Sequence, residues 1–138
     1  MNHWLVKSEP CKYAWTTFEV DGGTHWDGVR NLQARNNLSA MRKNDLVLFY
    51  HSNEGKEVVG VARVTREAYP DPSSQDPQWV AVDLTPYYKL EKPVGLTQIK
   101  ADVRLQRIAL LRQSRLSVMP LSREEFDTVL ELGTSSAK

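Results

Sequence analysis

The sequence predicts an α+β domain in which short strands form a small mixed β-barrel with flanking helices. Strand-like patterns are spread along the whole chain, at 3–7, 45–52, 57–67 and 79–85. Helical patterns stand between them or at the end and do not alternate strictly with strands. The glycine-rich loop of parallel nucleotide-binding folds is absent. A length of 138 residues suits one domain, which we assign to 1–133, with 134–138 as a disordered tail.

Composition and charge limit the classes of partner. Apolar residues make up 41% of the chain and charged residues 25%, and the formal net charge is +1. These values are typical of a globular domain and argue against a binder that relies on salt-sensitive, non-specific attraction to nucleic acid. Basic residues nevertheless gather in 28–45 and in 100–115. If these two segments meet in the fold, they form one anion-attracting face.

Other classes of site find little support. The single cysteine, Cys11, excludes an internal disulfide and a cysteine-based zinc site. The three histidines lack metal-ligand spacing, and no apolar run approaches the roughly 20 residues of a membrane span. The first residues do not resemble a secretory signal. We therefore expect a cytoplasmic monomer with no cofactor, no metal and no membrane partner.

The first half of the chain predicts four elements. Residues 3–7 form a strand that Pro10 ends. A short helical turn follows at 16–20, and apolar spacing predicts a helix over approximately 30–42. Residues 45–52 are apolar on both faces until their end, which predicts a strand buried on both sides.

The middle of the chain predicts a hairpin and a loop. Residues 57–67 continue the sheet as a long strand, and Gly60 inside it indicates a bulge or a barrel corner. Three prolines predict an exposed loop over 68–78. Alternating apolar residues at 79–85 predict the next strand, which 87–90 either extends or follows as a new strand.

The last third predicts a helical cap. A weak helix is expected at 96–101, and 104–111 fits no single pattern. Residues 114–119 have the pattern of a final strand. Ser122 then caps a helix over 123–132, because the glutamate three residues later completes a capping box.

The stretch 26–36 carries the densest chemistry in the chain. It contains an indole, a carboxylate, a hinge glycine, two guanidinium groups and two asparagine carboxamides: Trp26, Asp27, Gly28, Arg30, Arg35, Asn31 and Asn36. Such groups can stack on a flat polar ring and hydrogen-bond its edge. The alternative is structural: Trp26 lies in the core, Asp27 caps the helix, and Arg30 and Asn31 pair with it.

Two predicted strand ends add further candidates. Lys7, Ser8 and Glu9 end the first strand, and His51 and Ser52 end the strand at 45–52. Strand ends commonly carry binding residues. Neighbouring residues of a strand point to opposite faces, so His51 and Ser52 do not form a nucleophile–base pair.

Carboxylates raise an enzymatic alternative. Glu9 and Asp27 together would provide a carboxylate pair for glycosidic bond cleavage. A simpler expectation is that Lys7 and Arg30 neutralise them as ion pairs.

Four motifs together resemble a known family. Lys7-Ser8-Glu9-Pro10, the stretch 26–36, residues 48–52 and residues 115–118 occur in the order found in EVE domains, and the likeness runs from Trp4 to about Leu132. The EVE domain belongs with the PUA-like barrels, whose relatives include YTH and SRA readers of methylated bases. In the family, more residues commonly separate the first strand from the Trp-Asp-Gly turn.

The resemblance implies a function. It implies a non-enzymatic reader that takes a single modified nucleobase, such as a modified cytosine or adenine in DNA or RNA, into a pocket with an aromatic wall. Pocket positions carried over are Ser8, Trp26, Asn31, His51 and Ser52, with Arg115 and Ser117 in a motif near the same cleft. An enzyme acting on a nucleobase or nucleoside, with Glu9 or Asp27 as acid–base group, stays open, as does a small-metabolite pocket. The full predicted ligand-binding set is Lys7, Ser8, Glu9, Trp26, Asp27, Arg30, Asn31, Asn36, His51, Ser52, Arg115 and Ser117.

Overall fold

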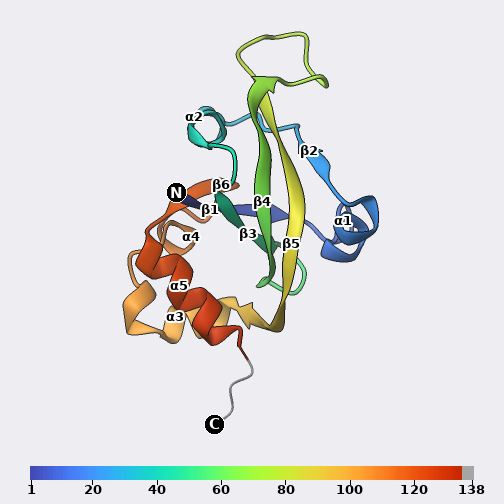
Figure 1. Ribbon diagram of the computed structural model, residues 1–138. Helices are drawn as coiled ribbons and strands as arrows, with labels where there is room; N and C mark the ends of the chain where they lie inside the picture. The colour runs from blue at the N-terminus through green and yellow to red at the C-terminus, as the bar shows by residue number, and fades with distance from the viewer. Residues whose placement is uncertain (135–138) are drawn as a thin grey trace.

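A computed structural model describes residues 1–134, and its centre is a six-stranded mixed sheet (Figure 1). The strand order is β2-β5-β4-β3-β1-β6. The strands are β1 (His3–Ser8), β2 (Thr24–Trp26), β3 (Leu46–His51), β4 (Glu57–Pro70), β5 (Val80–Gly95) and β6 (Val118–Leu121).

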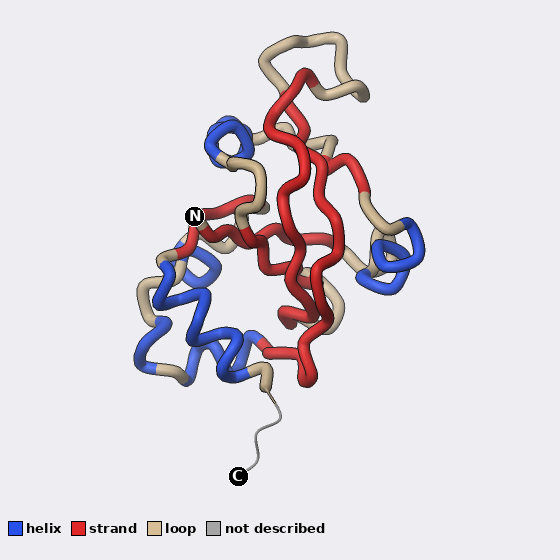
Figure 2. Tube along the Cα trace, viewed as in Figure 1, coloured by secondary structure: helices blue, strands red, loops and turns tan. Residues whose placement is uncertain are grey.

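Helices lie around the sheet, as Figure 2 shows. They are α1 (Trp15–Asp21), α2 (Leu32–Ala40), α3 (Leu96–Ala101), a 3-10 turn η1 (Val103–Leu105), α4 (Ala109–Arg112) and α5 (Arg123–Leu132). The predicted α+β class with flanking helices is confirmed. Over residues 1–134, β2 pairs only with β5 and β6 only with β1, so the strand pairings do not close the predicted barrel.

The strand pair β1 and β3 sets the geometry of the site. The two strands are parallel, and β1 also pairs antiparallel with β6. The register places Ser8 opposite His51, so the two predicted strand ends lie side by side. Both strands are buried in their middles, because apolar side chains cover both faces of this part of the sheet.

The long hairpin of β4 and β5 contains the predicted irregularity at Gly60. The pairing register shifts there against both neighbouring strands. The ring of Trp15 from α1 packs against this point, and a Cβ at position 60 would lie 2.5 Å from it. Glycine is therefore required here by close packing.

Two predicted boundaries in the hairpin are wrong. Residues 68–70, predicted as loop, extend β4, and Pro70 pairs with Val80. Residues 87–90 extend the strand predicted at 79–85, as one of the two alternatives had it, but β5 continues beyond residue 90 and ends at Gly95. The strand accommodates Pro86 at a register shift, where a missing N–H costs no regular ladder bond.

Three further differences lie close to the site. The three-residue strand β2 was not predicted, because it is too short to show alternation. The predicted helix over 30–42 begins only at Leu32 and ends at Ala40. Strand β6 begins at Val118 and not at residue 114, because Leu116 N–H donates to the Gln113 carbonyl (3.0 Å) and forms a turn.

The C-terminal helix follows its predicted signals. Ser122 caps α5, and Glu125 completes the reciprocal capping box. Phe126 and Val129 pack into the core, and Gly133 follows the helix. The predicted tail lies outside the described residues from position 135 onward.

Candidate functional site

A cleft of about 700 Å³ opens where the ends of β1 and β3 face β2 and the turn that follows it. This volume lies within the range of ordinary ligand pockets. Four separate segments line the cleft: Lys7, Ser8, Glu9, Lys12 and Tyr13; Thr24 through Arg30; Ser52 and Asn53; and Ser114, Arg115 and Ser117.

Backbone hydrogen bonds fix the side of the cleft formed by β1. Ser52 N–H donates to the Ser8 carbonyl (2.9 Å), and Lys7 N–H donates to the Ser117 carbonyl (2.9 Å). The Lys7 ammonium also donates to the Ser114 carbonyl (2.7 Å). Partial burial lowers the pKa of Lys7 from its ordinary value. The strand ends therefore bring together residues that lie more than a hundred positions apart in the sequence.

Ser8 lines the cleft, and its hydroxyl already has a partner. Its Oγ lies 2.6 Å from the carbonyl oxygen of Tyr13. A carbonyl oxygen only accepts, so the hydroxyl donates its proton there and keeps only lone pairs for a ligand.

An aromatic corner forms the opposite wall. The Trp26 indole is half-buried, and the ring of buried Phe49 packs edge-on against it at 5.6 Å between centroids. Tyr13 stands nearly perpendicular to Trp26, with centroids 6.4 Å apart and planes at 74°. The structural alternative for Trp26 holds in part: the residue packs against the core, but it is only half-buried and also lines the cleft.

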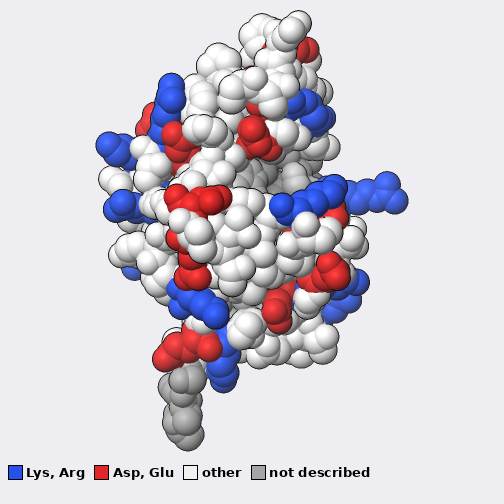
Figure 3. All heavy atoms as spheres, turned by 90° about the vertical axis from the view of Figure 1, so that its right-hand side faces the viewer, with Lys and Arg blue, Asp and Glu red and all other residues white. Residues whose placement is uncertain are grey.

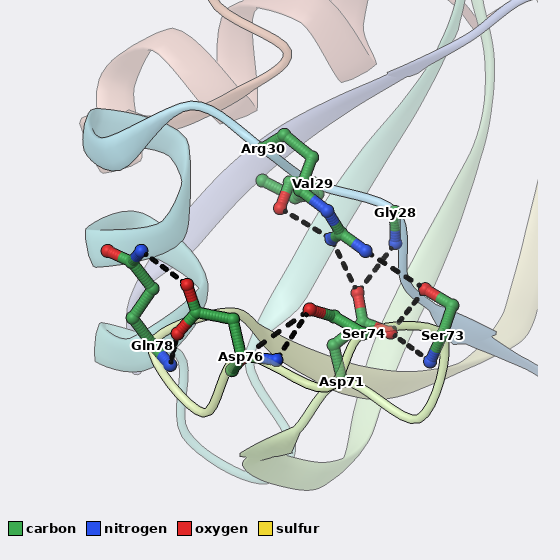
Figure 4. Close-up of polar contacts among 8 residues, drawn as sticks. All are labelled: Gly28, Val29, Arg30, Asp71, Ser73, Ser74, Asp76 and Gln78. Carbon is green, nitrogen blue, oxygen red and sulfur yellow. Dashed lines mark hydrogen bonds and ion pairs between the residues drawn. The ribbon is translucent and has the colours of Figure 1, made fainter.

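The buried carboxylate of Asp71 holds the turn after β2 through hydrogen bonds (Figure 4). Gly28 has φ +75° and donates its N–H to Asp71 Oδ2 (2.8 Å). The Arg30 guanidinium donates to the same oxygen (2.9 Å), to its neighbour's carbonyl at Val29 (3.0 Å) and to Ser73 Oγ (3.2 Å). The glycine reaches this left-handed conformation without steric cost.

Asp71 is only 2% exposed and fully hydrogen-bonded. Its second oxygen accepts from Ser73 N–H (2.7 Å) and Ser73 O–H (2.6 Å). Burial by itself raises the pKa of Asp71, but the hydrogen bonds from Ser73, Arg30 and Gly28 outweigh burial and hold that pKa well below its ordinary value. Asp71 is therefore an anion at neutral pH and ties the β4–β5 loop to the wall of the cleft.

The predicted ion pairs among the site residues are wrong. Arg30 pairs with Asp71 and lies over the Trp79 ring at 5.7 Å. Glu9 approaches Lys12 (3.7 Å) and accepts from Asn53 (3.4 Å). The Asp27 carboxylate is exposed at the rim and makes no hydrogen bond or ion pair within residues 1–134.

Three predicted site residues do not line the cleft. The Asn31 side chain caps α2 by accepting from Ala34 N–H (2.9 Å). Asn36 accepts from its neighbour Arg35 (2.8 Å). His51 Nε2 accepts from Trp15 N–H (3.1 Å), and burial lowers its pKa. The other nine predicted residues come together there: Lys7, Ser8, Glu9, Trp26, Asp27, Arg30, Ser52, Arg115 and Ser117.

Sequence reasoning missed Tyr13 and Asp71. The only local signal for Tyr13 is its position three residues after Pro10, where a turn returns the chain toward β1. Asp71 opens an Asp-Pro-Ser-Ser segment, a pattern typical of a side chain that hydrogen-bonds backbone N–H two residues on. Its contacts with the turn were not visible, because Gly28 and Arg30 lie 43 and 41 residues away.

Each of the two basic segments supplies one guanidinium to the lining of the cleft, Arg30 and Arg115. Arg104 pairs instead with Asp102 (2.8 Å) and Glu131 (3.0 Å). Figure 3 shows acidic and basic side chains interspersed over the face it draws.

Within residues 1–134, no group of three or more His, Cys, Asp or Glu side chains is placed to hold a metal ion. No helix there combines the length and apolar character needed to cross a membrane.

Comparisons with known proteins match nearly the whole chain. Mouse thymocyte nuclear protein 1 is 35% identical over 165 aligned residues, covering 95% of this chain and 73% of the mouse protein. The human THYN1 protein, solved in complex with 5-methylcytosine containing DNA, is 33% identical with a TM-score of 0.91, covering 99% of this chain and 100% of that one. The YTH domain of Zygosaccharomyces rouxii MRB1 protein, solved with N6-methyladenosine RNA, shares the fold at TM-score 0.62 and 15% identity, covering 99% and 89% of the two chains.

The family assignment rests on sequence and on fold together. The EVE domain matches residues 2–132, which include every residue that lines the cleft. The chain belongs to the EVE domain family.

Proposed function

We propose that this protein is a reader that binds a single modified nucleobase of DNA or RNA in the cleft and performs no chemistry on it. A modified cytosine in DNA is the first candidate, since the human relative was solved with such DNA. The base would leave its stack at a cost of a few kcal/mol and regain about 1–3 kcal/mol by stacking on an aromatic ring.

One observation carries the proposal: Trp26 is anchored to the core on one side and borders the cleft on the other. An indole held in this way is a preformed stacking surface. The perpendicular Tyr13 ring closes the corner, so a flat ring on Trp26 would meet Tyr13 at its edge.

Positive groups at the rim suit a polymer ligand. Lys12 and Arg115 are exposed beside the cleft, and Lys7 lies deeper. They would attract the phosphates flanking the bound base. With a net charge of only +1, the protein would depend on base contacts for much of its affinity.

The test is a comparison of labelled oligonucleotides that differ in one methyl group. We expect DNA with one 5-methylcytosine to bind roughly tenfold more tightly than the unmethylated sequence, since a methyl group in a fitted notch is worth about 1–3 kcal/mol. Trp26→Ala should remove this difference in fluorescence anisotropy titrations. Tyr87→Ala is the matched control, because Tyr87 is an aromatic residue exposed on β5 that does not line the cleft.

Three outcomes would contradict the proposal. One is equal affinity for modified and plain oligonucleotides across methylated cytosine and adenine in DNA and RNA. Another is binding of free nucleosides as tightly as oligonucleotides, which would indicate a metabolite pocket. The third is conversion of the base during incubation, abolished by Glu9→Gln or Asp27→Asn, which would indicate an enzyme.

A further inference from the structure

We infer that Ser8 is a specificity-determining residue whose fixed acceptor selects a base with an amino group at pyrimidine position 4 or purine position 6, that is cytosine or adenine, over bases with a keto oxygen there, such as thymine and uracil. This inference rests on the proposed function and names the chemical class of base that the same cleft would take.

The direction of the Ser8 hydroxyl is fixed by its partner. The 2.6 Å contact between Ser8 Oγ and the Tyr13 carbonyl requires the serine proton to lie between the two oxygens. A serine hydroxyl that is free can rotate to donate or to accept. This one has no proton left, so its remaining lone pairs in the cleft are acceptors only.

The position of Ser8 is fixed as well. Its own carbonyl accepts from Ser52 N–H (2.9 Å), and its strand neighbour Lys7 is paired to the Ser117 carbonyl (2.9 Å). The Tyr13 carbonyl is held by a turn in which Lys12 and Tyr13 N–H groups both donate to the Glu9 carbonyl (2.9 and 2.8 Å). The acceptor is thus preorganised before any ligand arrives.

The groups around Ser8 add both hydrogen-bond donors and hydrogen-bond acceptors to the cleft. The Lys7 ammonium uses one of its three donors on Ser114, which leaves donors for a ring nitrogen or carbonyl. Asp27 contributes an unpaired carboxylate at the rim, another acceptor for an amino group. Acceptors beside a donor match the edge of cytosine, where the 4-amino donor adjoins acceptors at N3 and O2.

Thymine has nearly the shape of 5-methylcytosine but presents O4, an acceptor, in place of the amino donor. If thymine bound here, its O4 would place lone pairs opposite those of the Ser8 hydroxyl oxygen. The half-buried serine oxygen would then have no donor. The methyl group does not distinguish these two bases. Discrimination between them must come from the polar edge.

The experiment uses single-stranded oligonucleotides, so that base pairing costs are the same for every probe. One position carries 5-methylcytosine, thymine, or 5-methyl-2-pyrimidinone, which lacks the 4-substituent. We expect 5-methylcytosine to bind most tightly and thymine on the order of 10- to 100-fold more weakly. The pyrimidinone should fall between them, since it removes the donor without adding an acceptor.

Variants then locate the effect. Ser8→Ala should reduce the preference for 5-methylcytosine over thymine to within about threefold, and Ser8→Thr, which keeps a hydroxyl, should restore much of it. Ser39→Ala is the matched control, because Ser39 is exposed on α2 and does not line the cleft, so the ratio of the two probes should stay unchanged.

The outcomes separate this inference from the proposed function. If 5-methylcytosine binds better than cytosine but thymine binds as well as or better than the pyrimidinone, the Ser8 inference is wrong and the reader proposal stands. If modified and plain bases bind equally across methylated cytosine and adenine in DNA and RNA, the reader proposal fails, and the order of the probes still decides the Ser8 inference. The order of the three probes on the unaltered protein decides the question even if Ser8→Ala does not fold.

Discussion

The two walls of the cleft are built by different means. The wall containing Lys7, Ser8 and Ser52 is part of the sheet, and each residue is held by main-chain hydrogen bonds to a neighbouring strand or to the segment before β6. The opposite wall is the three-residue strand β2 with the turn after it. That turn is held mainly through the side chain of Asp71, which reaches from the β4–β5 loop (Figure 4).

Because of this difference, the two walls should respond differently to mutation. A ladder of main-chain bonds tolerates most side-chain changes, whereas a turn held by one carboxylate depends on that residue. In the proposed reader, the sheet wall would select the base through hydrogen bonds to its edge, and the turn wall would stack on its face. A change that breaks the sheet should unfold the domain, while a change at Asp71 should reshape the cleft at smaller cost to stability.

The largest expected effect is a loss of stability in the sheet that carries the first wall. Gly60→Ala would place a Cβ 2.5 Å from the ring of Trp15, which is only 2% exposed and has no room to move. We expect the free energy of unfolding in urea to fall by about 3 kcal/mol, as overpacking of a rigid core usually costs 1–3 kcal/mol or more. Gly95→Ala is the control, since its Cβ would meet nothing closer than 3.9 Å. An unchanged urea midpoint for Gly60→Ala would show that α1 can shift away from β4.

Asp71→Asn tests the turn wall. The amide is isosteric but loses the charge that holds Arg30, and one of its two polar atoms can no longer accept. We expect a loss of about 1–3 kcal/mol in stability together with a loss of preference for the modified base. Asp76→Asn, in the same loop and bonded locally to Gln78, is the matched control. Stable folding with unchanged binding in Asp71→Asn would contradict the dependence of the turn on this carboxylate.

The pH dependence of stability follows from the same group. Because the folded-state pKa of Asp71 lies below its unfolded value of about 3.8, its stabilising contribution is complete above that value and is lost as the pH falls further. Stability measured from about pH 4 downward should therefore fall more steeply in the unaltered protein than in Asp71→Asn, whereas the two should run parallel at higher pH.

The contrast between the walls also explains what sequence reasoning could predict. Lys7, Ser8 and Ser52 were found because Pro10 and the end of an apolar run mark where strands stop, and such signals are local. Asn31 was assigned to the cleft by its place in a dense polar stretch, yet Asn is a preferred N-cap and serves α2.

Asp71 could not be predicted as an anchor of the turn, for a physical reason. The partners of Asp71 lie more than forty residues away, and its segment has the composition of an exposed loop. No periodicity reports such a pairing; only the twist and length of the β4–β5 hairpin bring the loop over the turn. Strand β2 was not predicted for a related reason. Its three residues form a strand because they pair with β5, and they show no sequence pattern of their own.

The smallest expected effect concerns the back of β2. His25 Nδ1 lies 2.9 Å from Asp83 Oδ1 and 2.9 Å from the Tyr69 hydroxyl, which itself donates to Asp83. Burial, with the hydrogen bond and charge of Asp83, raises the pKa of Tyr69 to about 12. A folded pKa above the unfolded value of about 10 means that this contribution to stability is present below pH 10 and is lost as the pH rises toward 12.

The ultraviolet difference spectrum between the unaltered protein and Tyr69→Phe isolates this phenol from the other four tyrosines. Near pH 11 it should remain mostly protonated, and Asp83→Asn should let it ionise closer to pH 10. Neutral-pH binding should change little, because Asp71, on the other side of the turn, still holds Gly28 and Arg30. An ordinary Tyr69 titration in the unaltered protein would mean that β2 is not braced from behind, and Asp71 would then be the sole side-chain anchor of the stacking wall.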